Sequence, residues 1–357
     1  MKINTNSQHF AAFSAFLLSS QILFNPLYKS QYKIGAAAVT VIIGLLLNSF
    51  FSWFFDKCQL READNTVLSK SIGIISAVSL CVLSSVLANE FLNAAAMFSN
   101  YYSKESTSLL FLAVLLFCCA YAGFSSTGGI MRFCSLSCAG FVIYFAVLFF
   151  ALRTLGGVVK PDSPDFANIS FSFLREGFLS TLYFVCDIPV FFLCCISENR
   201  YHHDIIMPKV SRAAFRSSLI ILCVNCMRAA LMFGNTLSSD LYSCDLTSLT
   251  LIPHFSFPEI YLFATGFACI LKISVYLYTA SVMLPDITAK NGAKSLYKYV
   301  LPAIGTFFAV CIIRKLTDAR TDFKSPFFAV LCVLCLVSVT LFAYLCFFGK
   351  RRENTHG

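Results

Sequence analysis

Long apolar blocks recur along this 357-residue chain and constrain its fold more than any other feature. A helix needs about 20 mainly apolar residues to cross the hydrocarbon core of a bilayer. About ten such blocks are present, at roughly residues 10–28, 34–55, 71–98, 107–124, 133–152, 178–196, 213–234, 258–284, 297–313 and 326–348. The sequence therefore predicts an all-α integral membrane protein in which residues 1–357 form a single transmembrane domain.

Composition agrees with this prediction and excludes two other classes of protein. Hydrophobic residues make up 58% of the chain and charged residues 13%, whereas soluble domains hold about 45–50% and about 25%. A soluble enzyme is thus excluded. Disordered chains are poor in aromatic residues, and this chain has 39 Phe and 15 Tyr. We expect the first block to be a retained helix, because Gln21, Asn25 and Pro26 interrupt it where a signal peptide would have small residues for cleavage.

The chain has a net charge of +9, but we expect no binding of nucleic acid. Most Lys and Arg residues lie in short loops between the apolar blocks, where positive charge sets the orientation of the protein in the membrane. The N-terminus and the loops after the even-numbered blocks carry more Lys and Arg than the loops on the other side. Positively charged loops stay in the cytoplasm. Both termini are therefore predicted to be cytoplasmic.

Cysteine and histidine residues give no sign of a cofactor or a metal site. Most of the 17 Cys residues lie inside apolar blocks, where Cys behaves as a small hydrophobic residue. The 5 His residues form no ligand set, and no nucleophile–base pair is evident. We therefore expect no cofactor and no enzymatic activity.

Two ionisable side chains stand deep in apolar blocks, which makes them candidate functional residues by default. Asp187 precedes Pro189 by two residues and predicts a broken helix whose free amides would hold an anionic group. Alternatively, Asp187 binds a cation, pairs with a lysine or marks a structural kink. Lys272 lies too deep for its ammonium group to reach the membrane interface. We expect it either to contact a ligand or to form an ion pair with Asp187 or Glu90.

Weaker polar signals come from the first and third blocks. In the first block, Ser19–Gln21 is followed by Asn25–Pro26, which indicates either an unwound stretch or the outer end of the helix. In the third block, Ser84 and Ser85 are more typical of helix packing than of a ligand site.

The eighth block contains the run Leu271-Lys272-Ile273-Ser274-Val275-Tyr276-Leu277-Tyr278-Thr279-Ala280. This run resembles the Phe-Lys-Ile-Ser-Leu-Tyr-Leu-Tyr-like stretch in the eighth helix of the B subunits of spore germination receptors. Phe173-Leu174-Arg175-Glu176-Gly177 is similar to the Leu-Glu-Asn-Gly stretch before the sixth helix of that family, and Asp187 falls where members tend to have a Gly-Glu pair. Length, ten helices and cytoplasmic termini also agree, so the resemblance covers essentially the whole chain.

The resemblance implies a fold, a location and partners. The family belongs to the amino acid–polyamine–organocation transporter superfamily, which has a five-plus-five inverted repeat with helices 1 and 6 broken at the midplane. Its members lie in the inner membrane of bacterial spores with an A subunit and a lipoprotein C subunit, and they sense nutrients, commonly amino acids. Leu23 and Cys186 stand where the family usually has glycine, so this backbone is less free to unwind.

The resemblance also implies a ligand pocket near the midplane of the lipid bilayer. Lys272 would stand where sodium-coupled relatives hold a cation between helices 1 and 8. The residues expected to line the pocket are Gln21, Ser84, Ser85, Val185, Cys186, Asp187, Ser274 and Tyr276. The function this favours is a nutrient-sensing receptor subunit, with an amino-acid permease as the alternative and a structural subunit with a decayed pocket as a third interpretation.

Overall fold

The computed structural model describes ten stretches of the chain. Within them, all regular secondary structure is helical and no strand is present. The stretches are residues 5–23, 42–54 (without 48 and 52), 67–102, 108–124, 127–156, 185–195, 212–223 (without 218, 221 and 222), 257–284, 297–316 and 326–347.

Seven long helices carry most of the described structure. They are α1 (Thr5–Leu23), α3 (Val67–Tyr102), α4 (Ser108–Phe124), α5 (Thr127–Gly156), α9 (Phe257–Met283), α10 (Tyr297–Leu316) and α11 (Pro326–Phe347). Shorter apolar helical segments lie at Ile42–Phe51 and Val185–Cys195. Among the described residues, the segments long and apolar enough to cross a membrane are Val67–Asn89, Gly128–Val147 and Phe263–Met283. The described structure is thus compatible with a helical membrane protein.

The observed helices differ from the predicted blocks mainly at their ends. The predicted blocks 71–98 and 133–152 lie inside the longer helices α3 and α5, because polar residues at both ends continue the helical hydrogen bonding. The first helix begins at Thr5, earlier than the predicted 10–28, and residues 24–28 lie outside the described residues. The second, sixth and seventh blocks are described only in part.

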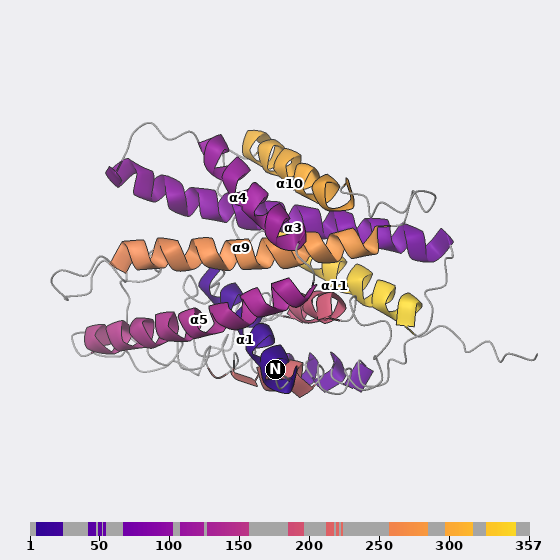
Figure 1. Cartoon of the computed structure of the whole chain (residues 1–357), viewed down its shortest axis with the longest axis horizontal. Helices are drawn as coiled ribbons and strands as arrows, with labels where there is room; N and C mark the ends of the chain where they lie inside the picture. Colours follow the sequence, from indigo (N-terminus) through magenta and orange to yellow (C-terminus); the bar gives the residue numbers. More distant parts are fainter. Residues whose placement is uncertain are drawn as a thin grey trace, which may run out of the picture.

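Helices α3 and α9 lie side by side and run in opposite directions through the bundle (Figure 1). Two contacts fix their alignment: the Cys269 thiol donates to the carbonyl of Leu87 at 3.6 Å, and Gly73 lies against the carbonyl of Met283. Helix α9 also packs against α1, α4, α5 and α10, while α3 packs against α10 and α11. These two helices therefore form the centre to which most of the others attach.

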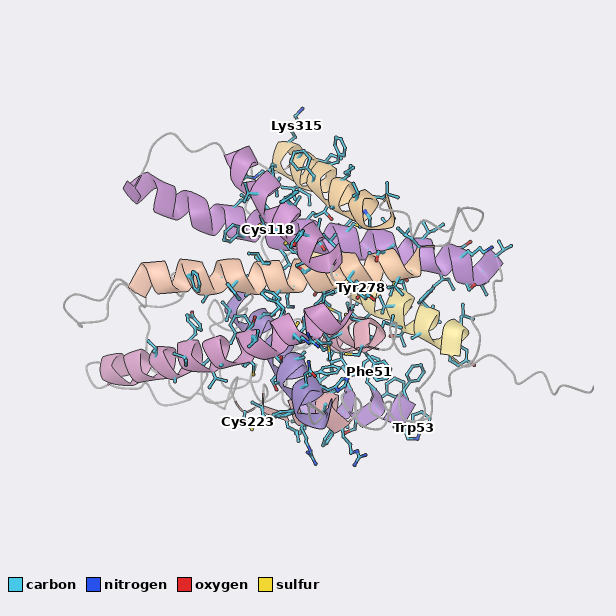
Figure 2. The ribbon with its side chains drawn as sticks, in the orientation of Figure 1. Phe51, Trp53, Cys118, Cys223, Tyr278 and Lys315 are labelled. Atoms are coloured by element: carbon cyan, nitrogen blue, oxygen red, sulfur yellow. The ribbon has the colours of Figure 1, made fainter. Side chains whose placement is uncertain are left out.

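Helix α10 runs in the same direction as α3. The thiol of Cys81 contacts the carbonyl of Pro302 at 3.7 Å, and further along both helices Arg314 Nε donates to Asn89 Oδ1 at 3.2 Å. Beyond Arg314, Lys315 projects away from the bundle at the end of α10 (Figure 2). Helix α10 therefore ends in basic residues, which suits its negative C-terminal dipole end.

The long helices are apolar on their outward faces as well as on the faces that pack inside the bundle. Large hydrophobic side chains are exposed on several of them, and a helix that is apolar on all sides is typical of a membrane span. Examples are Val78, Phe117, Leu136, Phe308 and Leu341. These faces are suited to contact with lipid acyl chains.

Gly73 sets the distance between α3 and its neighbours α9 and α11. A Cβ at this position would lie 2.5 Å from the carbonyl oxygen of Met283 and 3.1 Å from the ring of Phe342. Small residues at such crossings let backbones approach closely inside a membrane. Gly140 and Gly305 are also helical, but a Cβ there would meet nothing within 4 Å.

We predict that Gly73→Ala destabilises the protein by about 1–3 kcal/mol, because the added methyl group forces α3 away from the backbone of α9. Thermal unfolding in detergent measures the change. Gly140→Ala and Gly305→Ala are matched controls and are expected to leave the melting temperature unchanged or slightly raised. A Gly73→Ala protein as stable as these controls would contradict the close packing of α3 on α9.

Candidate functional site

A buried carboxylate, Asp187, lies at the centre of the candidate site. It belongs to the segment Val185–Cys195, whose residues are all buried, and its side chain is 0% exposed. An ionised carboxylate removed from solvent is stable only when charged or polar donors surround it. Asp187 receives hydrogen bonds from three side chains, Lys272, Tyr276 and Ser20.

Two of these donors come from one face of α9. Lys272 and Tyr276 are four residues apart, so the helix places both on the same side. The Lys272 ammonium Nζ lies 2.6 Å from Asp187 Oδ2 and also donates to the Tyr276 hydroxyl at 3.5 Å. Tyr276 in turn donates to Asp187 Oδ1. The three side chains therefore form a closed ring of hydrogen bonds around a buried ion pair.

The third donor, Ser20, comes from α1. Its hydroxyl lies 2.5 Å from Asp187 Oδ2 and 3.4 Å from the carbonyl of Phe16, one turn earlier in the same helix. The contact to the carboxylate is the shorter of the two and involves a charged acceptor, so it is the stronger. Ser20 thereby connects α1 to the Val185–Cys195 segment.

Aromatic rings enclose the charges. The Lys272 ammonium lies 5.3 Å from the ring centre of Phe16 and 5.6 Å from that of Tyr276, within the range of cation–π attraction. Phe16 stacks on Phe191 at 4.7 Å, and Phe13 meets the same ring edge-on at 4.5 Å. Since Phe13, Phe16 and Phe191 are all fully buried, the ion pair lies in apolar surroundings. We call Ser20, Asp187, Lys272, Tyr276 and Phe16 the charged cluster.

The helix containing Asp187 continues through Pro189. The sequence predicted a break between these residues, but Val185–Cys195 is continuously helical. Pro189 is the fifth residue of the described segment. Its lack of an N–H removes only one backbone hydrogen bond there, so the helix continues. Side chains of α1 and α9 hold the Asp187 carboxylate. Helix α1 is likewise continuous from Thr5 to Leu23, and Asn25–Pro26 lie outside the described residues.

The other predicted pocket residues have different surroundings. The hydroxyls of Ser85 and Ser274 donate to carbonyls of their own helices, Val82 at 2.6 Å and Ile270 at 2.5 Å. Such bonds satisfy a hydroxyl inside a helix without any ligand. For Gln21, the structure describes the backbone but not the side chain.

Val185 and Cys186 immediately precede Asp187 in the chain and are both fully buried. The thiol of Cys186 lies beside that of Cys332 in α11. Cys186 therefore brings the Val185–Cys195 segment into contact with α11. The described residues include no group of three or more His, Cys, Asp or Glu side chains that could hold a metal ion.

Ser84 is fully buried, and its hydroxyl has no hydrogen-bond partner among the residues that the structure describes. It precedes Leu87 by three residues and Phe91 by seven, and both of these contact α9, so Ser84 lies on the face of α3 that packs on α9. Because Leu87 lies opposite Cys269 and the helices are antiparallel, Ser84 lies at the level of Lys272. Ser84 therefore lies at the same level along the helix axes as the charged cluster, but within the interface between α3 and α9.

Of the cluster residues, Asp187, Lys272 and Tyr276 were predicted from the sequence, Ser20 was noted only within the polar run Ser19–Gln21, and Phe16 was missed. The signal for Ser20 was present in the polar run Ser19–Gln21, and Phe16 lies one turn before it on the same face of α1. What the sequence lacked was the alignment of α1 with the Val185–Cys195 segment. The sequence offered Asp187 and Glu90 as ion-pair partners of Lys272, and in the structure Lys272 pairs with Asp187. The side chain of Glu90 lies outside the described residues.

No protein-family model matches the chain, and no curated protein matches it.

We predict that Lys272→Met destabilises the protein by about 3–5 kcal/mol, because it leaves the buried Asp187 carboxylate without its counter-ion. The double variant Asp187→Asn/Lys272→Met, in which no charge is buried, is expected to recover most of this loss. Lys315→Met, at an exposed position, is the control and should change stability by less than about 0.5 kcal/mol. Chemical or thermal unfolding in detergent compares the four proteins. Equal losses in the single and double variants would mean that the charges do not interact.

We predict that Ser84→Ala leaves stability unchanged or raises it by about 1 kcal/mol, because it removes a buried hydroxyl that has no partner. Ser85→Ala is the neighbouring control; it removes a satisfied hydroxyl and should lower stability slightly. Unfolding of both variants in one detergent makes the comparison. A marked loss in Ser84→Ala alone would show that this hydroxyl bonds a group essential to the fold.

Proposed function

We propose that this chain is the nutrient-sensing membrane subunit of a spore germination receptor, with a small ligand, commonly an amino acid, bound at the charged cluster. The observation that carries the proposal is the buried Asp187–Lys272 ion pair, to which three helices contribute. In the predicted order of spans these helices are the first, the sixth and the eighth. They are the helices that surround the ligand and cation sites in the transporter superfamily the sequence resembles.

A five-plus-five inverted repeat is part of the proposal, and the pairing of helices supports it. In such a repeat the first span corresponds to the sixth and the third to the eighth, with opposite directions in the membrane. Helix α1 packs antiparallel to Val185–Cys195, since Phe16 lies against Phe191 and Ser20 against Asp187. Helices α3 and α9, the predicted third and eighth spans, also pack antiparallel.

The directions of the helices also support the predicted number of spans. Successive spans alternate in direction, so spans that are both odd or both even run parallel. Helices α3 and α10, the predicted third and ninth spans, run parallel. The Val185–Cys195 segment and α9, the sixth and eighth, do so too, because α9 reaches Asp187 from Tyr276 and the carbonyl of Val190 from Thr279. Breaks in the first and sixth spans would have to lie outside residues 5–23 and 185–195.

Ligand binding is proposed to act through the ion pair. The pair joins α1, Val185–Cys195 and α9 to one another. A ligand that contacts Asp187 or Lys272 changes the relative stability of this closed arrangement and of one in which the helices are further apart. Partner subunits, proposed to be an A subunit and a lipoprotein C subunit in the inner spore membrane, would respond to that shift. The cytoplasmic placement of both termini comes from the loop charges.

The alternative function is an amino-acid permease. The same observation favours it, because three helices held together by one ion pair can separate to admit a substrate and release it on the other side. The two functions differ in a single measurable property, since a permease moves its ligand across the membrane and a receptor does not.

We expect one or a few amino acids to raise the melting temperature of the purified protein, without accumulating inside liposomes that contain it. The matched variants are Lys272→Met, which should lose the ligand-dependent rise, and Lys315→Met, which should retain it. In the organism, deletion of the gene should abolish spore germination with those amino acids while growing cells still take them up. Uptake of the amino acids by the liposomes would instead show that the protein is a permease. No response to any nutrient would favour the third interpretation, a structural subunit.

A further inference from the structure

The groups around the Lys272 ammonium are those that recognise a primary ammonium ion. One carboxylate oxygen accepts at 2.6 Å, a tyrosine hydroxyl lies at 3.5 Å, and two aromatic rings lie at 5.3 Å and 5.6 Å. The carboxylate supplies the opposite charge, the hydroxyl accepts a second N–H, and the rings attract the cation through their negative faces. Asp187 and Phe16 belong to other helical segments than Lys272, whereas Tyr276 lies in the same helix, α9.

The geometry discriminates against other cations. A nitrogen at 2.6 Å from an oxygen must carry a proton that it donates, so a quaternary ammonium group cannot take this position. The aromatic rings at 5.3 Å and 5.6 Å add attraction for an organic cation. The site is therefore matched to a group of the type R–NH₃⁺.

We propose that the charged cluster is a binding site for protonated primary amines, and that Lys272 is its tethered internal occupant. A ligand places its ammonium group where Lys272 Nζ lies and displaces the lysine from Asp187. Because the cluster has one negative and one positive charge, a ligand that enters the wild-type protein also brings an anionic group to match the displaced lysine. This inference rests on the proposed function only in taking the charged cluster as the ligand site.

Removing the lysine side chain tests the proposal, because Lys272→Ala leaves the carboxylate, the hydroxyls and the rings in place and frees the volume of an alkylamine. Propylammonium chloride should raise the melting temperature of Lys272→Ala saturably, by about 2–5 °C at concentrations well above the dissociation constant. Sodium chloride and tetramethylammonium chloride at the same ionic strength should produce no saturable rise. Wild-type protein and the double variant Asp187→Asn/Lys272→Ala should not respond to propylammonium.

Two results would overturn the proposal: no response of Lys272→Ala to propylammonium, or an equal response to tetramethylammonium or in the double variant. If Lys272→Ala does not form monodisperse protein alone, the comparison is made during production. Propylamine in the growth medium should then restore monodisperse protein, and failure to do so while the double variant folds counts against the site.

The outcome is separable from that of the proposed function. Amino-acid binding by the wild-type protein without rescue of Lys272→Ala would retain the receptor and reject the ammonium site. Rescue without any nutrient response of the wild-type protein would establish the ammonium site and reject the sensing function.

Discussion

A carboxylate buried among hydrocarbon side chains needs donors within reach, and the packing around Asp187 supplies them. Ser20 approaches from α1, and Lys272 and Tyr276 approach from α9. Each contact requires a particular rotation and height of its helix, because hydrogen bonds weaken steeply when the distance or angle changes. The ion pair thus fixes how α1, Val185–Cys195 and α9 meet. Hydrophobic packing alone gives little preference between alternative alignments in a membrane, where lipid is as apolar as the helices.

Under the proposed function, the same ion pair would make this junction responsive to a ligand. Two opposite charges in apolar surroundings are costly to separate and costly to leave alone. In the proposed function, a ligand that offers matching groups would release this closed arrangement. Stability and ligand recognition would then depend on the same atoms of Asp187 and Lys272. This is why a structural ion pair and a ligand site are not exclusive interpretations of one cluster.

Away from the cluster, polar side chains serve packing. The hydroxyls of Ser76, Ser137 and Thr340 donate to carbonyls one turn earlier in their own helices. A hydroxyl satisfied in this way adds little polarity to the helix surface and keeps the side chain small. Gly73 has the same role in more extreme form, since it admits the backbone of α9 directly. These positions explain how long apolar helices pack closely without charged partners at every crossing.

The sequence by itself determined the class of protein, the approximate positions of the helices, and two ionisable residues placed where lipid would not tolerate them. It also placed Lys272 and Tyr276 on one face, because that relation depends only on helical periodicity. Only the tertiary structure decided that Ser20, 167 residues from Asp187, and Lys272, 85 residues away, meet the same carboxylate. It also decided that α3 faces α9 at Gly73 and that the helix runs unbroken through Pro189. Local patterns record which face of a helix is polar, whereas the partner of that face follows from how distant segments are aligned.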